Sequence, residues 1–339
     1  MAALSDQLLV VTILAYLVAM VGYAAQYAFG RRGLVARATS GPARQPALHA
    51  THASTTPGSG TDDGGGTDGG GGGTDGGGGG TDGGTTAGAR SVLIGQFPLT
   101  ALLLAAVAHL STFVTRGLAA ERLPWGNMYE FILTASLIGV LTWLVTVFRQ
   151  PSVGHLGLYV SLVAVVLLGL AGMSPLYTPV GPLVPALDSY WLLIHVAAAA
   201  TGAGIFLVGF ITAVMYLVRT GYDRGRRGFP FPLGIRVPAA GVVERLTFRL
   251  HAFGFPVWTF AVVAGAIWAE SSWGRYWAWD PKEVWAFISW VVYAAYLHAR
   301  ATPSVKPTTT AWLAIAGWIT ILMNLFGVNL FLESLHSYA

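Results

Sequence analysis

Cysteine is absent from this 339-residue sequence, and charged residues are scarce. Without cysteine the chain cannot form a disulfide framework, an iron–sulfur site, a cysteine-ligated zinc site or a thiol nucleophile of its own. Asp, Glu, Lys and Arg make up only 10% of the residues, against roughly 25% in soluble domains. Any thiol chemistry must therefore use a sulfur from another molecule. The sequence is also too poor in charge for a soluble protein.

Long apolar runs dominate what is present. The chain is 54% hydrophobic with a mean hydropathy of +0.60. Lipid offers no hydrogen-bond partner to an unpaired backbone amide, so apolar runs of about 20 residues cross a bilayer as helices. We therefore predict an all-α, polytopic integral membrane protein with about eight transmembrane helices. The predicted spans are residues 8–29, 97–115, 128–148, 156–172, 190–218, 252–269, 284–299 and 310–332.

The predicted organisation has three parts. Residues 1–30 hold the first transmembrane helix, which lacks a basic leader and a small-residue cleavage site and is expected to be retained. Residues 31–95 are dominated by glycine, threonine and aspartate, which cannot bury enough apolar surface to offset chain entropy, so a disordered linker is predicted there. Residues 96–339 form a seven-helix membrane domain. The simplest role for the linker is that of a passive tether.

The distribution of Lys and Arg predicts the orientation in the membrane. If the linker is cytoplasmic, fifteen of the nineteen Lys and Arg residues lie on its side of the membrane. Cytoplasmic loops are enriched in these residues, so both termini are expected outside. The opposite side then holds Arg116, Arg122, Arg275 and Lys282. Because the arginines lie between apolar spans and not along one face, no nucleic-acid partner is expected.

The most informative stretch is residues 268–290, which carry six of the twelve tryptophans. Tryptophan also collects at membrane interfaces as an aromatic belt, but a belt needs only one or two per span. Here the indoles are mixed with Asp280, Lys282 and Glu283, which predicts a flat apolar surface with charged edges. Asp280 precedes Pro281 and is expected to cap a helix with Glu283 in its first turn, although both carboxylates could also serve as general acids or bases.

Such a surface suits a large planar aromatic ligand that carries carboxylates at one edge. Arg275 and Lys282 can meet the carboxylates, and indole faces supply stacking area. In the predicted topology His195 and His336 lie on the same side as the tryptophans, and imidazole is a standard axial ligand of haem iron. We therefore predict a bis-histidine site for haem b on the tryptophan surface.

Several motifs resemble one known family. They are WGRYWAWDPKEVWAFISW and YLHAR (residues 296–300), with WGNMYEF (125–131), GFPVWTF (254–260), GAIWAE (265–270) and LHSYA (335–339). The first run resembles the WWD signature of the CcsA/ResC family of system II cytochrome c biogenesis, and the resemblance covers residues 97–339. It implies that His195 and His336 ligate haem iron on the outer side, and that His298 binds haem within the membrane. The haem surface is then expected to comprise Trp273, Trp277, Trp279, Asp280, Trp285, Arg275 and Lys282.

The resemblance also implies a function. A multi-pass protein of the cell membrane is expected to work with a CcsB/ResB-type subunit, to export haem and to present it for thioether attachment to the Cys-x-x-Cys-His motif of apocytochrome c. The complex would then be an enzyme, a holocytochrome c synthase or haem lyase. There are three alternatives: a haem delivery protein without ligation activity, a cytochrome b-like diheme electron carrier, and a cofactor-free scaffold. His109 and His251 match no ligand position and are predicted to be structural. Glu130, at the edge of a span, is a functional candidate with no identified partner.

Overall fold

The computed structural model describes residues 1–29, 83–183 and 185–332, and this part of the chain contains helices but no strand. Residues 29, 83–95 and 186 are described by their backbone alone. The all-α prediction is confirmed. The longer helices are α1 (Ala2–Phe29), α3 (Gly83–Ala120), α4 (Met128–Arg149), α5 (Gly157–Ala171), α6 (Tyr190–Asp223), α7 (Ala240–Trp273), α8 (Pro281–Ala301) and α9 (Pro307–Leu322).

Each predicted span corresponds to one of these helices, and seven helical segments are long and apolar enough to cross a membrane. The exception is α8, which occupies the predicted span 284–299 but carries polar residues in its first and last turns. The last predicted span is built from α9, a π-helical turn (Met323–Gly327) and the short helix α10 (Val328–Phe331). These findings establish a polytopic helical membrane protein.

The predicted linker falls mainly on residues 30–82, which lie outside the described residues. Its last part, residues 83–95, falls in α3, which begins at Gly83. The glycine-rich composition predicted chain disorder up to residue 95. Helix formation begins at the last glycine pair, before the apolar run Val92–Ile94.

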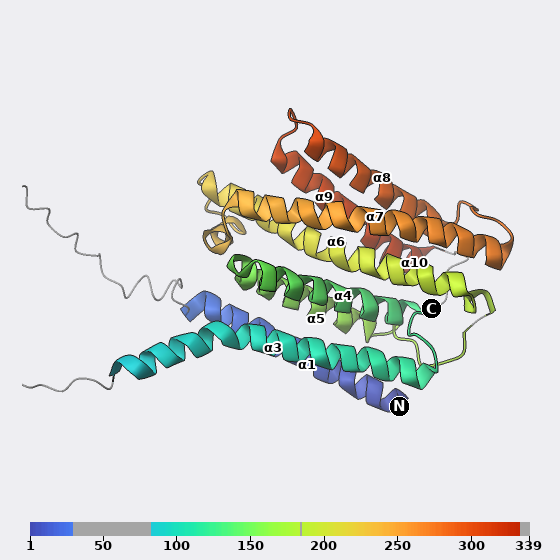
Figure 1. Cartoon of the computed structure of the whole chain (residues 1–339), viewed down its shortest axis with the longest axis horizontal. Coiled ribbons are helices and arrows are strands. Elements are labelled where there is room, and N and C mark those ends of the chain that lie inside the picture. The colour runs from blue at the N-terminus through green and yellow to red at the C-terminus, as the bar shows by residue number, and fades with distance from the viewer. Residues whose placement is uncertain (30–82, 184, 333–339) are drawn as a thin grey trace, which may run out of the picture.

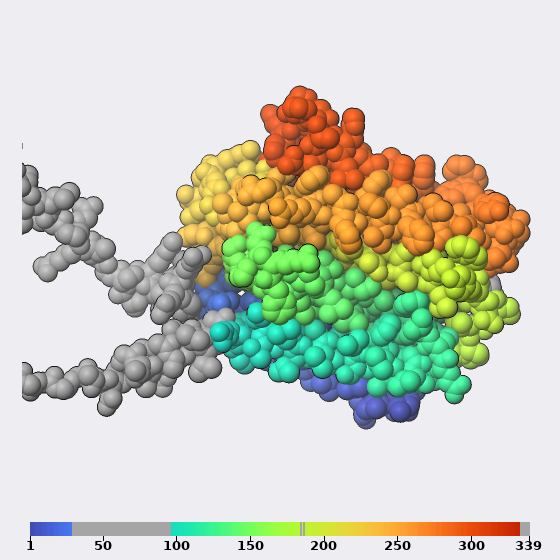
Figure 2. Space-filling view, viewed as in Figure 1, coloured from blue at the N-terminus to red at the C-terminus, as the bar shows by residue number. Residues whose placement is uncertain are grey.

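The helices form one bundle in which sequence neighbours pack side by side. Contacts are most extensive between α6 and α7 and between α1 and α3, while α4 joins the two groups by packing on both α5 and α6 (Figure 1). Figure 2 shows the same order in space, with α4 and α5 between α3 and the α6–α7 pair. Glycine allows the closest approach: a Cβ atom on Gly204 of α6 would lie 2.7 Å from the Ala135 carbonyl oxygen of α4. Small residues commonly bring membrane helices this close.

Three connections lie together at one end of the bundle: residues 121–127 between α3 and α4, residues 172–189 between α5 and α6, and residues 274–280 between α7 and α8 (Figure 1). We call this the cavity end. At the other end, the linker end, α1 ends and α3 begins. The cavity end carries the segment predicted to face outward, and that orientation stays a prediction.

Candidate functional site

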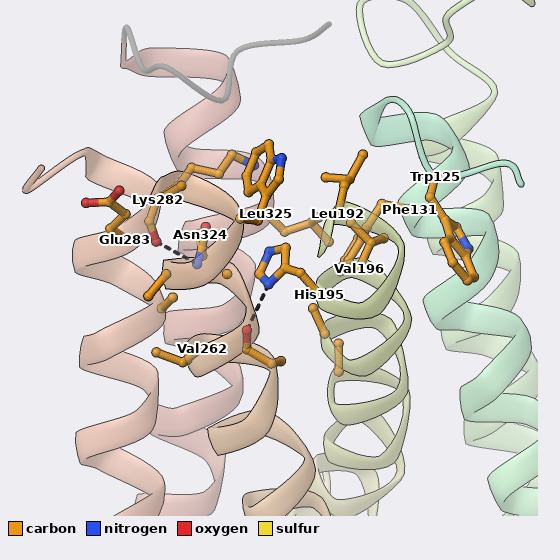
Figure 3. Close-up of a pocket in the computed structure, with 18 of the residues that line it drawn as sticks. Trp125, Phe131, Leu192, His195, Val196, Val262, Lys282, Glu283, Asn324 and Leu325 are labelled. Carbon is orange, nitrogen blue, oxygen red and sulfur yellow. Dashed lines mark hydrogen bonds between the residues drawn. The ribbon is translucent and has the colours of Figure 1, made fainter. Parts of the chain in front are cut away.

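A cavity of about 200 Å³ lies at the cavity end, among α4, α6, α7, α8 and the π-helical turn. Figure 3 shows that Trp125 and Phe131 line one side and that Lys282 and Glu283 lie on the other, with His195 between them. The lining is mostly apolar and aromatic, with a few polar groups, which is the usual composition of a small-molecule site. The main lining residues are Trp125, Met128, Phe131, Leu192, His195, Trp258, Trp268, Trp277, Lys282, Asn324 and Leu325.

His195, in the second turn of α6, is held by two contacts with α7. Its Nδ1 atom lies 2.9 Å from the Ala261 carbonyl oxygen, and its ring is stacked on Trp268 with centroids 5.8 Å apart. A carbonyl can only accept, so Nδ1 carries the proton and Nε2 carries the lone pair. Metal-ligating histidines typically donate their second ring nitrogen to a carbonyl in this way. The contact therefore prepares Nε2 for ligation.

Gly265 of α7 makes this placement possible. A Cβ atom there would lie 2.7 Å from His195 Nδ1 and 2.8 Å from Cε1, closer than non-bonded carbon atoms approach. Only glycine leaves room for the imidazole against α7. The position of His195 thus depends on a residue one turn beyond its hydrogen-bond acceptor.

The structure distributes the predicted tryptophan surface over three environments. Trp268 and Trp277 line the cavity. Trp273 packs edge-on against Trp268, with centroids 4.8 Å apart, and Trp285 also lies outside the cavity lining. Trp279 is 74% exposed and has a φ of 60°, a conformation that costs non-glycine residues energy. The connection itself is only residues 274–280, since α7 continues to Trp273 and α8 begins at Pro281.

Asp280 and Glu283 form the predicted helix cap, which is confirmed. The Asp280 side chain accepts a hydrogen bond from the Lys282 backbone N–H (3.1 Å). The Glu283 carboxylate accepts from the N–H groups of Ala278 (2.8 Å) and Asp280 (3.2 Å). This reciprocal arrangement is a capping box. Because Glu283 bonds on both sides of Trp279, the cap also holds the left-handed turn.

Lys282 brings a partly buried positive charge to the cavity. Its Nζ atom is 3.7 Å from the Met128 sulfur, and its carbonyl accepts a hydrogen bond from Asn324 at 3.2 Å. Within the described part of the chain it makes no salt bridge. Lys282 precedes the predicted span 284–299, and burial lowers its pKa to about 8 although nearby Asp280 opposes the shift. An ammonium in this position favours an anionic ligand. Arg275, the other predicted cation, is exposed and does not line the cavity.

His298, another predicted ligand, does not line the cavity. His298 is exposed on α8, 16 positions after Lys282, which is about 24 Å along a helix. His336 lies outside the described residues. His109 and His251 are fully buried, with ring nitrogens 3.0 Å from the Leu133 carbonyl oxygen and 2.8 Å from that of Thr247, so the prediction that both are structural is confirmed.

Sequence reasoning missed several residues that line the cavity, among them one from a helical turn far along the chain. Trp125 and Met128 belong to the WGNMYEF motif, and Trp258 belongs to GFPVWTF, so the motifs held a signal that was not used for the site. Asn324 gave no signal. It reaches the cavity from the π-helical turn Met323–Gly327, and π-turns of this kind occur often at functional sites.

Comparison with known proteins supports a shared family for this part of the chain. The family model described as cytochrome C assembly protein matches residues 125–336, a range that contains every residue lining the cavity. The chain is 34% identical over 244 residues to the cytochrome c biogenesis protein CcsA of Guillardia theta, covering 66% of this chain and 79% of the relative. It is 32% identical to CcsA of Gloeobacter violaceus (69% and 84% covered) and of Thermosynechococcus vestitus (75% and 87% covered). The chain therefore belongs to the cytochrome c assembly protein family.

Proposed function

We propose that this membrane protein acts in cytochrome c assembly by holding haem in the cavity and presenting it for attachment to apocytochrome c. The observation that carries the proposal is the arrangement of His195: its Nδ1–H is donated to Ala261, and its ring lies in an aromatic cavity that also contains the partly buried ammonium of Lys282. A ligand with a metal, a flat apolar body and a carboxylate matches all three features.

The described residues fit part of such a ligand. A volume of about 200 Å³ is below the roughly 300–1,000 Å³ of pockets that enclose a drug-sized molecule, so the cavity would cover one part of the macrocycle. Partial cover suits haem as a substrate, since the vinyl groups must reach the thiols of another protein. We propose His336 as a second residue that would hold the iron, and a CcsB/ResB-type subunit as the partner that completes the site.

Each lining group has a distinct role in this proposal. His195 ligates the iron and fixes the position of the macrocycle, Lys282 pairs with a propionate, and Trp268 and Trp277 exclude water from the ring face. When haem reacts, each thiol of the Cys-x-x-Cys-His segment adds across a vinyl group, forming a carbon–sulfur bond and transferring its hydrogen to the other vinyl carbon. Positioning of the two reacting groups is the main contribution open to the protein, and it can supply roughly 7–11 kcal/mol of the barrier. Since this chain lacks cysteine, it offers no competing thiol.

The direct test is a pyridine haemochrome assay with a visible spectrum of the purified full chain, expressed alone and with a ResB-type partner. We expect haem b with a low-spin spectrum in at least the co-expressed sample. Absence of haem from both samples would contradict the proposal and would favour the interpretation of the tryptophans as an aromatic belt at the membrane interface. A second stable haem in the isolated chain would instead favour the diheme electron carrier.

The pH dependence of haem binding tests the role of Lys282. The free protein has a Lys282 pKa of about 8, and pairing with a propionate raises the pKa in the complex. The extra affinity is therefore complete below pH 8 and is lost as the pH rises through the pKa of the complex. Haem titrations between about pH 6.5 and 10 should show this loss in the parent, while Lys282→Gln should bind with lower affinity and little pH dependence in that range. If the parent and Lys282→Gln showed the same pH dependence of haem affinity, Lys282 would have no role in binding haem.

A further inference from the structure

The role of Glu130 follows from a buried cluster of ion pairs at the cavity end. The Glu130 carboxylate is fully buried in the first turn of α4 and receives Arg116 Nε at 3.0 Å and Arg122 Nη1 at 2.8 Å. Arg116 is likewise fully buried, while the Arg122 side chain is 16% exposed. Breaking a buried ion pair by removing one partner is strongly destabilising, because the other charge stays unpaired in a low dielectric. The cluster therefore resists separation.

The cluster fixes the connection 121–127 through several bonds. Glu130 Oε2 accepts from the Gly126 N–H at 2.8 Å, and Asn127 caps α4 by accepting from the Glu130 N–H at 2.9 Å. Arg122 also donates to the Leu123 carbonyl at 3.0 Å. Its guanidinium therefore bonds both to the connection and to Glu130 in the first turn of α4. A Cβ atom on Gly126 would lie 2.8 Å from Arg122 Nη2. The backbone is thus packed directly on the ion cluster.

The ion cluster also contacts the connection 172–189. Arg116 donates to the Thr178 carbonyl, and its guanidinium lies 4.8 Å from the centroid of the Tyr129 ring. Tyr129 packs edge-on against Tyr177, whose hydroxyl donates to Asp6 of α1 at 3.0 Å. One carboxylate therefore ties together two of the three connections at the cavity end.

The residues held by the cluster form a wall of the cavity. Trp125, Gly126, Asn127 and Met128 all line it, and they lie two to five residues before Glu130. The Met128 sulfur is also the neighbour of the Lys282 ammonium, at 3.7 Å. A shift of the connection would move the aromatic wall and change the surroundings of the group proposed to meet a propionate.

We propose that Glu130 is a positioning residue which, through Arg116 and Arg122, sets the Trp125–Met128 wall of the cavity and thereby its fit to haem. The inference rests on the proposed function for the identity of the ligand. The geometry of the wall, however, can be measured without any ligand. Glu130 touches neither the cavity nor Lys282, so it acts only through the residues that it holds.

The absence of cysteine allows a clean distance measurement. Spin labels would be attached to Leu123→Cys, in the connection 121–127, and to Glu270→Cys, near the end of α7. The distance between the labels in the full chain reports how far the connection lies from α7. Both native side chains are exposed. Arg122→Gln is the informative variant, because it frees the connection while leaving the buried Arg116–Glu130 pair intact. Asp223→Asn is the matched control, since it removes one charge from the ion pair with Arg219 at the linker end.

We expect Arg122→Gln to broaden the distance distribution and to weaken haem binding about tenfold, as loss of one charge-assisted hydrogen bond predicts. Arg122→Lys, which keeps the charge but not the two-sided contact, should lie between Arg122→Gln and the parent. The control should match the parent in both measurements. An unchanged distribution in Arg122→Gln would overturn the positioning role. If Arg122→Gln broadens the distribution and the parent protein itself binds no haem, the positioning role is supported and the proposed ligand is refuted.

Discussion

Replacing His195 with alanine should abolish low-spin haem in the purified protein and lower haem affinity by more than about 100-fold, since an iron ligand contributes more than the groups that orient it. The structure gives the reason: Ala261 fixes the tautomer, Trp268 stacks on the ring, and Gly265 makes room for it. Removing the side chain leaves space at the position of the ligand. Exogenous imidazole should therefore enter and restore the low-spin spectrum.

His251→Ala is the matched control for this experiment. His251 is also a helical histidine whose Nδ1 donates to a carbonyl, that of Thr247 at 2.8 Å, but it does not line the cavity. The variant should lose stability and keep its haem spectrum. His336→Ala tests the ligand that lies outside the described residues and should behave as His195→Ala does. Unchanged spectra in both the His195 and the His336 variants would refute the ligand assignment.

The spans were predictable because each depends on local composition. A run of apolar residues must form a helix in lipid, whatever its neighbours do. Helix ends were predictable where a capping side chain marks them, as Asp280 and Glu283 do for α8. The start of α3 was not, because glycine content alone could not locate the residue at which helix formation begins.

The cavity was only half predictable, and the reason is distance along the chain. His195, Trp277 and Lys282 were recognised from their own segments, but Met128 and Asn324 become part of the site only when α4 and the π-helical turn pack beside α8. The same holds for Glu130: its partner Arg116 lies on another helix, and only the fold brings the two within 3.0 Å. Conversely, Trp279 belongs to the motif, but its left-handed backbone leaves its ring largely exposed.

Gly265→Val should displace the His195 side chain while leaving the imidazole in the protein. The Cβ atom alone would meet the ring at 2.7 Å, so the side chain must rotate away from α7 and lose its bond to Ala261. We expect low-spin haem to disappear and haem affinity to fall by roughly 10–100-fold, the effect typical of losing an outer contact of a metal ligand. Overpacking should also lower the unfolding free energy by about 1–3 kcal/mol. Haem titration and thermal unfolding of the same samples would measure both effects.

Gly209→Val separates these two effects, because the same kind of contact recurs on the same pair of helices. A Cβ atom on Gly209 would lie 2.5 Å from His251 Cε1, so the valine crowds a histidine that is remote from the cavity lining. This variant should lose stability to a similar extent and retain the haem spectrum. If both glycine variants lost haem in proportion to their instability, the loss would reflect general loosening of the α6–α7 interface. Loss of haem in Gly265→Val alone would show that the cavity requires His195 in its observed position, and not merely an imidazole nearby.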